Sequence, residues 1–330
     1  MIPRNWLEES AIRIAPYIQK TPITYDVAHN LYFKWENHQV TGSFKARGAL
    51  NKVLSLQKWE LDRGLVTASA GNHGQGVALA ANIVGAKVVI FASEHAVPSK
   101  IMAMRSQGAD IHLVPGGYGE AEQAGLGFAT KNGAVWISPY NDGQVIAGQG
   151  TLALEILKEY PILSQSTWVV PAGGGGLISG IGVALKGESK ASRSEIQPQL
   201  MAVQSETSAY LFTIFYKGSQ SGVTELPSLA DGLAGPVEDN AITIPLVKHY
   251  VDDFLLVTEE EIIYSIIYAW QCYHERIEGS AAVALAAILT GKVNLRPAVV
   301  IISGGNIQPD VHQQLINNSI TDQNSQITAH

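Results

Sequence analysis

The chain has 330 residues, of which 46% are hydrophobic and 15% charged, and its formal net charge is -7 at pH 7. This length is enough to bury a large core and to form more than one domain. The acidic balance, with no block of lysines and arginines, excludes a nucleic-acid surface, which needs a clustered basic footprint. Apolar runs such as Ala298 to Ile302 are too short to cross a bilayer, so no membrane partner is expected.

The N-terminus and the cysteine content indicate the compartment of the protein. Residues 1–9 contain no apolar signal region. The single cysteine, Cys272, excludes an internal disulfide framework and fits a reducing environment. The sequence therefore predicts a cytoplasmic protein.

Short β-branched runs alternate with longer helical patterns along most of the chain. Strand candidates are residues 65–68, 87–91, 111–114, 134–137, 168–170, 201–203 and 299–302. This alternation predicts crossover connections and mostly parallel sheets covered on both faces, in a compact α/β protein with two lobes. Thr258 and Glu261 form a predicted capping box that opens a helix through Trp270. The polar, aperiodic segment from Asn318 to His330 is predicted to be a frayed tail.

The first candidate for chemistry is Lys45, in the run from Thr41 to Ala49. Thr41-Gly42-Ser43 is typical of a helix entry, and Phe44 to Leu50 has the pattern of an apolar first turn. A lysine in that setting is partly desolvated, which lowers its pKa and frees the amine for imine chemistry. Lysines flanked by Gly, Ser and Phe are usually ordinary surface residues, so this run alone does not identify a catalytic amine.

The second candidate is the loop from Ser69 to Gly76, which directly follows the predicted strand ending at Ala68. Its glycines and Asn72 offer backbone N–H groups and one side-chain amide at the carboxyl edge of a sheet, where α/β proteins bind ligands. His73, taken alone, is more often a structural histidine than a catalyst. The loop is therefore predicted to clamp a carboxylate and a cofactor.

The third candidate is the run of four glycines from Gly173 to Gly176, between the predicted strand 168–170 and a helix starting near Leu177. A strand, a glycine turn and a helix N-terminus together form the general shape of a phosphate site. The spacing argues against a dinucleotide fold, because the final glycine of G-x-G-x-x-G falls on Ile178 or Ser179. No lysine follows the glycines, which excludes a P-loop. The pattern favours a phosphate monoester.

The fourth candidate is Ser303-Gly304-Gly305-Asn306, which follows the strongest C-terminal strand. By itself it predicts only a turn. Facing a cofactor ring, the hydroxyl of Ser303 would stabilise a neutral pyridine nitrogen, whereas a carboxylate would keep that nitrogen protonated. A neutral ring is a weaker electron sink, which suits elimination of a β leaving group better than transamination.

Together, these four segments resemble the pyridoxal-phosphate enzymes of the tryptophan synthase β-like fold, and most of all the branch of threonine/serine dehydratases and serine racemases. The resemblance runs along nearly the whole chain. Its further motifs are Thr21-Pro22, Lys34-Trp35-Glu36-Asn37, Gly148-Gln149-Gly150-Thr151, Ala230-Asp231-Gly232-Leu233-Ala234 and Glu278-Gly279-Ser280. It implies a two-lobed, three-layer α/β/α fold with pyridoxal 5'-phosphate as cofactor.

The resemblance also implies a role for each site residue. Lys45 would form the Schiff base with the cofactor and then act as the base at the substrate's Cα. Phe44 would pack against the ring, Asn72 would bind the ring hydroxyl, Ser303 would face the ring nitrogen and Gly232 would line the ring pocket. The phosphate would be held by Gly173, Gly174, Gly175, Gly176 and Leu177. The substrate carboxylate would be surrounded by Ser69, Gly71 and His73.

The implied reaction removes the Cα proton and expels the β-hydroxyl of an amino acid such as L-threonine or L-serine. Hydrolysis then gives a 2-oxo acid and ammonia. The implied domains are a large cofactor-binding domain, residues 1–56 and 142–330, and a small mobile domain, residues 57–141, that closes over the site. The resemblance also implies a homo-oligomer, either a dimer or a tetramer.

Three departures from the family pattern narrow these expectations. Racemases of this branch carry a serine where Ala70 stands, and alanine cannot move a proton, so elimination is favoured over racemization. Some members bind a divalent cation through a glutamate and an aspartate at the positions of Gln204 and Tyr210, with Glu206 close but out of phase, so no metal is expected. The segment 26–32 is shorter than usual, which bears on an edge strand or a subunit contact and not on the chemistry.

Separately from these departures, the chain ends too soon after Asn306 for a regulatory domain. This predicts an unregulated, catabolic form.

Two kinds of alternative stay open. The first is a dehydratase of the same mechanism that acts on a larger or more acidic β-hydroxy amino acid. It stays open because Pro236-Val237-Glu238 departs from what is expected of an ordinary threonine deaminase. No arginine near residues 138–142 or 233–238 would fix a second carboxylate. A β-replacement enzyme would carry an asparagine after the lysine, where this chain has Ala46. A non-catalytic binding protein would lack Lys45, and a nicotinamide dehydrogenase needs a different glycine spacing.

Overall fold

The computed structural model describes residues 1–187 and 197–327 of the chain. Its strands are β1 (Ile23–Asp26), β2 (Leu31–Trp35), β3 (Leu65–Ala68), β4 (Val88–Ser93), β5 (Asp110–Val114), β6 (Val135–Trp136), β7 (Thr167–Pro171), β8 (Gln199–Ser205), β9 (Asp253–Val257) and β10 (Ala298–Ile302). They form one sheet of six strands, in the order β1-β2-β10-β7-β8-β9, and one of four, in the order β5-β4-β3-β6. All neighbours pair in parallel except β1 and β2.

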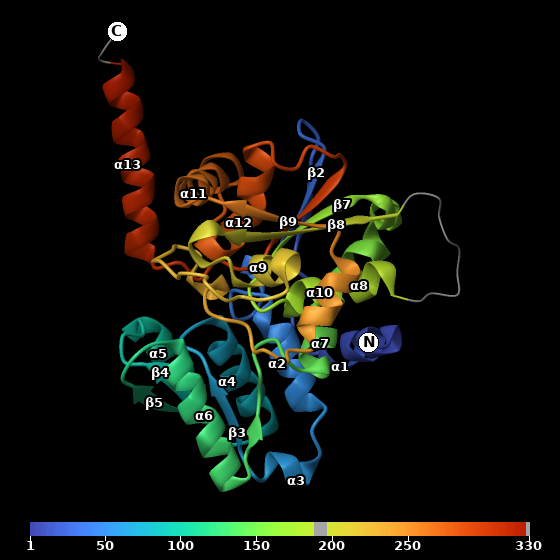
Figure 1. Cartoon of the computed structure of the whole chain (residues 1–330), viewed down its shortest axis with the longest axis vertical. Helices are drawn as coiled ribbons and strands as arrows, with labels where there is room; N and C mark the ends of the chain where they lie inside the picture. Colours follow the sequence, from blue (N-terminus) through green and yellow to red (C-terminus); the bar gives the residue numbers. More distant parts are fainter. Residues whose placement is uncertain (188–196, 328–330) are drawn as a thin grey trace.

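Helices cover both faces of both sheets (Figure 1). The α-helices are α1 (Arg4–Ile14), α2 (Lys45–Leu54), α3 (Lys58–Leu61), α4 (Asn72–Val84), α5 (Pro98–Ser106), α6 (Tyr118–Asn132), α7 (Gly143–Glu159), α8 (Gly176–Lys186), α9 (Tyr210–Lys217), α10 (Thr243–Tyr250), α11 (Glu259–Tyr273), α12 (Gly279–Leu289) and α13 (Pro309–Ile327). Short 3-10 turns include η1 (Glu36–His38), η2 (Pro161–Gln165), η3 (Glu206–Ser208) and η4 (Asp231–Leu233).

The core follows the alternation of side chains along the central strands. On β10, Val299 and Ile301 join the apolar cluster under α7 and α8, whereas Val300 and Ile302 join the cluster under α11 and α12. A strand buried on both faces needs such a continuous apolar run. The predicted fold, a three-layer α/β/α protein with mostly parallel sheets in two lobes, is confirmed.

All seven predicted strands exist, but the sequence did not reveal β1, β2 and β9. β1 and β9 are the two edges of the six-stranded sheet, and an edge strand is paired on one side only, so its apolar pattern is weaker. β2 is interior, but the fully buried Lys34 interrupts its apolar run. The capping box of Thr258 and Glu261 is present at the start of α11.

The prediction that residues 318–330 form a frayed tail is wrong over most of this segment. The segment from Asn318 continues α13 as far as Ile327, and residues 328–330 lie outside the described residues. α13 leaves the large lobe and extends away from it (Figure 1). The polar composition indicated disorder, but a helix needs no apolar periodicity where it does not pack.

Three helices between the lobes pack with their backbones in contact. A Cβ atom at Gly148 of α7 would lie 2.6 Å from the carbonyl oxygen of Arg47 on α2. On the other side of α7, a Cβ atom at Gly150 would lie 2.6 Å from the carbonyl oxygen of Gly180 on α8. Only glycine permits such approaches. The motif Gly148-Gln149-Gly150-Thr151 therefore contacts both α2 and α8 and fixes their positions relative to each other.

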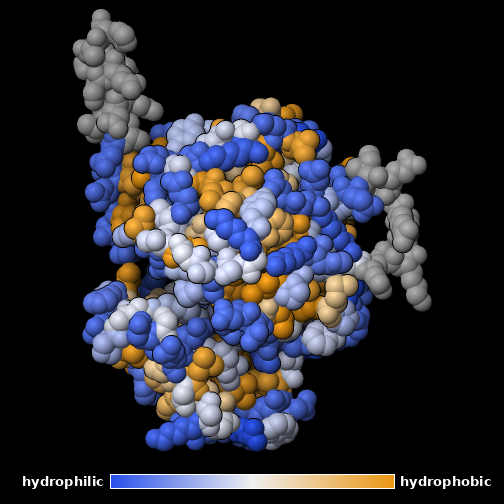
Figure 2. Space-filling model, viewed as in Figure 1, coloured by the Kyte–Doolittle hydropathy of each residue, from blue (hydrophilic) through white to orange (hydrophobic). Residues whose placement is uncertain are grey.

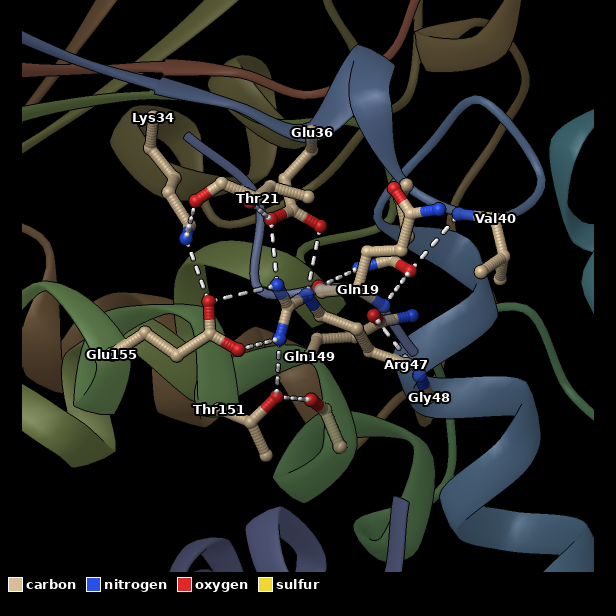
Figure 3. A network of polar contacts seen from close by, with 12 residues as sticks. Gln19, Thr21, Lys34, Glu36, Val40, Arg47, Gly48, Gln149, Thr151 and Glu155 are labelled. Atoms are coloured by element: carbon tan, nitrogen blue, oxygen red, sulfur yellow. Dashed lines mark hydrogen bonds and ion pairs between the residues drawn. The ribbon is translucent and has the colours of Figure 1, made fainter. Parts of the chain in front are cut away.

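A buried ionic network stabilises the contact between α2 and α7 (Figure 3). The guanidinium of Arg47 donates to Glu36 (Nε to Oε2, 2.7 Å) and to Glu155 (Nη1 to Oε1, 2.7 Å). Lys34 Nζ contacts Glu155 Oε2 at 2.6 Å, and Thr151 Oγ1 accepts from Arg47 at 3.2 Å. Two cations and two anions balance in this network, so each buried charge has a partner.

The strands of the four-stranded sheet all lie between residues 65 and 136, inside the segment 57–141 that was expected to form a small domain. α2, outside that segment, contributes Ala46, Ala49 and Leu50 to the core of the small lobe. The movement of residues 57–141 as a unit stays a prediction.

Hydrophilic residues cover much of the face seen in Figure 2, with apolar residues in patches between them. Within residues 1–187 and 197–327, no helix combines the length and apolar character that a membrane span requires.

The contact between α2 and α7 predicts that replacing glycine by alanine changes the free energy of unfolding in different ways at two helical glycines. Gly148→Ala would drive a methyl group into the backbone of α2, and we expect a loss of about 2 kcal/mol or more in the free energy of unfolding. Gly127→Ala is the control, because Gly127 lies on exposed α6 with open space around its Cβ position. We expect it to be neutral or to stabilise by up to about 1 kcal/mol. Urea unfolding of both variants measures this, and equal effects would contradict the packing argument.

Candidate active site

The residues singled out in the sequence line one cavity of about 790 Å³. It lies where β3, β7 and β10 end at their carboxyl edges, because Ser69, Gly173 and Ser303 follow these strands directly or within two residues. The predicted site residues that line it are Phe44, Lys45, Ser69, Gly71, Asn72, His73, Gly173, Gly174, Gly175, Gly176, Leu177, Gly232 and Ser303. The structure therefore brings every one of them together.

Lys45 is the first residue of α2, and its amine is held in the cavity away from a carboxylate partner. Its Nζ donates to the carbonyl oxygen of Pro139 at 3.0 Å and lies 5.2 Å from the centre of the Phe44 ring. Desolvation lowers the pKa of Lys45 to about 8, although the charge of Glu278 raises it in part. An amine with this pKa is far more often neutral near pH 7 than an ordinary lysine, as the sequence predicted.

The four glycines form a close-fitting turn between β7 and α8. A Cβ atom at Gly174 would lie 2.4 Å from the ring of Tyr140, and one at Gly173 would lie 3.0 Å from the Cα of Leu233. Gly175 caps α8 with a φ of +86°, which side-chain-bearing residues rarely adopt. The first N–H groups of α8 have no partner within the helix and carry its positive dipole end. This turn fits a phosphate group.

The loop from Ser69 leads into α4 in the same way. Ser69 Oγ accepts a hydrogen bond from the backbone N–H of Gly71 at 3.1 Å, and a Cβ atom at Gly71 would meet nothing within 4 Å. The first intrahelical bond of α4 is donated by Gln75 to the Gly71 carbonyl. The N–H groups before Gln75 are therefore free of helical partners and can bind an anion.

His73 does not supply a charge to this site. Its Nε2 lies 3.0 Å from the carbonyl oxygen of Ile137, so this nitrogen carries the proton and donates. Burial and the nearby Lys45 lower the pKa of His73 to about 3, which keeps the ring neutral. Its Nδ1 is then an acceptor and cannot bind a carboxylate. Only the backbone N–H of His73, in the first turn of α4, remains available for the predicted role.

Ser303 and Gly232 approach the cavity from the large lobe. Ser303 is buried, and its carbonyl accepts from the backbone N–H of Phe44 at 3.0 Å, which joins the end of β10 to the start of α2. The N–H of Gly232 donates to Ser280 Oγ at 2.9 Å. A Cβ atom at Gly232 would lie 2.8 Å from the same oxygen, so a larger residue would displace Ser280.

The sequence gave no role to Glu278, which the structure places in the wall of the cavity. Glu278 is 7% exposed, and its Oε1 accepts from Asn72 Nδ2 at 2.7 Å. Burial, and next the charge of Asp231, raise the pKa of Glu278 to about 7, although Lys100 and hydrogen bonds from Asn72 and the Asn306 N–H lower it in part. The motif Glu278-Gly279-Ser280 was the only sequence signal for this residue.

Tyr140 lies in the segment 138–142 that the sequence placed near the substrate pocket, but the sequence gave it no individual role. It lines the cavity, its ring contacts the glycine turn at Gly174, and its hydroxyl accepts from the backbone N–H of Glu238 at 3.0 Å. Only the fold could show that Tyr140 lies against residues more than thirty positions away.

At the positions where some family members bind a cation, this chain has Gln204 and Tyr210, and Gln204 bonds to the protein backbone. Gln204 Oε1 accepts from the backbone N–H of Phe212 at 3.2 Å. Tyr210 is the first residue of α9, and Glu206 lies in η3. Within the described residues, no group of three or more His, Cys, Asp or Glu side chains is placed to hold a metal ion. That the protein needs no metal stays a prediction.

Comparison with known proteins agrees with this site. Residues 9–304 match the family model described as pyridoxal-phosphate dependent enzyme. The L-threonine ammonia-lyase of Thermotoga maritima is 38% identical over 327 residues, which cover 97% of this chain and 79% of that protein. A catabolic L-threonine dehydratase of Staphylococcus aureus is 38% identical over 313 residues, covering 91% of this chain and 88% of that protein.

Among solved structures, serine racemase from Dictyostelium discoideum superposes with a TM-score of 0.83 at 32% identity, covering 93% of this chain and 99% of that one. A buried lysine and a glycine turn at a helix N-terminus, lining one cavity, are typical of enzymes that use an aldehyde-bearing phosphate cofactor. The chain belongs to the pyridoxal-phosphate dependent enzymes.

The lowered pKa of Lys45 predicts how fast the cofactor-free protein captures pyridoxal phosphate covalently. The neutral amine is the reactive form, and at pH 7 it makes up about one molecule in ten for a pKa of about 8. The share is roughly one in three thousand for an unperturbed lysine. We expect the rate to rise with pH and to level off above about pH 8. Borohydride trapping and mass spectrometry measure it, with Lys45→Ala as control. A rate that still rises about tenfold between about pH 8 and about pH 9, as for an unperturbed lysine, would contradict the lowered pKa.

Proposed function

We propose that the protein is an ammonia-lyase that dehydrates L-threonine and L-serine to the corresponding 2-oxo acids and ammonia. The observation that carries this proposal is that Lys45 and the glycine turn line the same cavity. The relatives from T. maritima and S. aureus, which act on L-threonine by their names, supply the substrate. The second of them is catabolic by name, which supports the same role here.

The proposed residue roles fit the geometry of the cavity. The glycine turn and the start of α8 would hold the cofactor phosphate, and Ser69, Gly71 and the backbone of His73 would hold the substrate carboxylate. Phe44, Asn72, Gly232 and Ser303 would surround the ring. When bound, the cofactor withdraws electrons from the substrate's Cα, which makes its proton acidic. The amine of Lys45 would take that proton, because it lies in the cavity and its lowered pKa makes the neutral form far more common than in an ordinary lysine.

A specialised substrate remains the second candidate. No arginine lines the cavity in the described part of the chain, but Lys100 does, and its Nζ pairs with the exposed Asp231 at 3.5 Å. A second carboxylate on the substrate could replace Asp231 as the partner of Lys100. This observation favours an acidic β-hydroxy amino acid over a merely bulky one.

Two further parts of the proposal concern the protein's surroundings. We infer a homo-oligomer in the cytoplasm from the family resemblance and from the single cysteine of the sequence. β-Replacement is disfavoured by Ala46, which follows the lysine and is fully buried in the core of the small lobe.

The decisive experiment combines a spectrum with a panel of substrates. We expect a visible absorption band that borohydride abolishes, and 2-oxo acid release from L-threonine and L-serine. Lys45→Ala should lose both the band and turnover, whereas Lys58→Ala, on exposed α3, should keep them. Full turnover by Lys45→Ala would overturn the proposed role. Turnover of 3-hydroxyaspartate alone would replace the threonine assignment with the specialised one.

A second prediction concerns stereochemistry. Ala70 lines the cavity, and its methyl group cannot return a proton to the face of Cα opposite Lys45. Ala70→Ser would place a hydroxyl there, and we expect it to form D-serine from L-serine while the wild type forms none. Chiral chromatography of the reaction mixture measures this. If the variant eliminates water but forms no D-serine, Ala70 is not what prevents racemization.

A further inference from the structure

A series of hydrogen bonds connects the segments around Thr41, Asn72, Glu278 and Asn306 at the edge of the cavity. Asn306 Nδ2 donates to the backbone carbonyl of Thr41 at 2.8 Å and to Asn72 Oδ1 at 2.7 Å. Asn72 Nδ2 in turn donates to Glu278 Oε1 at 2.7 Å. Thr41 precedes α2, Asn72 opens α4 and Asn306 follows β10, so these hydrogen bonds join elements that are more than two hundred residues apart.

The direction of these hydrogen bonds is fixed at the Thr41 end. The carbonyl of Thr41 can only accept, so the group of Asn306 that faces it must be the NH2 group. The same NH2 group faces Asn72, whose oxygen must therefore point toward Asn306. The nitrogen of Asn72 then points toward Glu278 Oε1, which accepts from it. A flipped amide at Asn72 would set its NH2 group against the NH2 group of Asn306.

The surrounding backbone leaves room for these hydrogen bonds only because two neighbours are glycines. A Cβ atom at Gly42 would lie 2.4 Å from Asn306 Oδ1, and one at Gly304 would lie 2.5 Å from Glu278 Oε1. The N–H of Gly305 also donates to the carbonyl of Gly42 at 2.9 Å. The side chain of Asn306 is thus packed into a slot that fits it closely.

We propose that Asn306 is a positioning residue that fixes the amide of Asn72 so that an N–H group, and not its oxygen, is presented to the phenolic oxygen of the cofactor. Asn72 lines the cavity and has two N–H groups, of which Glu278 takes one. The second stays free for an acceptor in the cavity. This inference rests on the proposed contact of Asn72 with the cofactor ring, and it adds the residue that makes this contact possible.

The test measures the affinity of the cofactor-free protein for pyridoxal phosphate, without any substrate. We expect Asn306→Ala to weaken binding about tenfold, since a hydrogen bond to a charged acceptor contributes about 1.5 kcal/mol or more. In the background of Asn72→Ala, adding Asn306→Ala should cause no further loss, because Asn306 acts through Asn72. Asn294→Ala, at a loop asparagine that bonds only the nearby Gly291 carbonyl, is the matched control and should bind as the wild type does.

Asn306→Asp provides a second test that keeps the shape of the side chain. An ionised carboxylate cannot donate to Thr41 or Asn72, whereas a protonated one can donate a single hydrogen bond. We expect the cofactor affinity of Asn306→Asp, relative to the wild type at the same pH, to be low at neutral pH and to recover in part as the pH falls. The wild type corrects for the protonation of Lys45, which both proteins share. Thermal melting of the cofactor-free variants reports folding separately.

Two results would overturn the inference. If the losses from Asn306→Ala and Asn72→Ala add in the double variant, Asn306 does not act through Asn72. If Asn72→Ala binds pyridoxal phosphate as the wild type does, the ring contact itself is absent. Neither result bears on whether the wild type releases a 2-oxo acid from threonine, so a failure here is distinct from a failure of the proposed function.

Discussion

The close approach of α2, α7 and α8 is the constraint on which the site depends. Gly148 lets α2 contact α7, and the pair Gly150 and Gly180 lets α8 contact the other side of α7. The lysine is the first residue of α2 and the phosphate turn ends at the first residue of α8. Because backbone contacts between helices tolerate almost no slack, helix packing sets the spacing between the backbone of Lys45 and the glycine turn.

The same helix places two cations in opposite environments. Arg47 points into the network of Glu36 and Glu155, where these charges keep its pKa raised despite burial. Lys45, two residues earlier, points into the cavity, where no carboxylate touches its amine and its pKa falls to about 8. Residues two apart lie on different faces of a helix. One face therefore carries a paired charge that fixes the helix, and the other an unpaired amine that can react.

The sequence predicted the parts of the site that follow strands, since ligand-binding loops at the carboxyl ends of parallel strands leave local patterns of glycine and polar residues. Asn72, the glycine turn and Ser303 were found in this way, whereas Lys45 was found from the helix entry that precedes it. Glu278 and Asn306 were given no role, and Tyr140 none beyond its place in a pocket segment, because they act through contacts with residues far along the chain. Asn72 meets Glu278 across 206 positions and Asn306 across 234, and no local pattern encodes such a contact. The edge strands and the full extent of α13 were missed because neither shows a strong apolar period.

In the proposed site, anions are bound mainly by backbone N–H groups. Burial keeps His73 neutral, no arginine lines the cavity among the described residues, and the turns proposed for the phosphate and the carboxylate lead into the N-terminal ends of α8 and α4. Backbone N–H groups do not ionise, so their hold on an anion does not change with pH. Lys45, with a pKa of about 8, and Glu278, with a pKa of about 7, line the same cavity. A pH change near neutrality would therefore alter the reactivity of Lys45 and the charge of Glu278, whereas the backbone N–H groups assigned to the anions would stay unchanged.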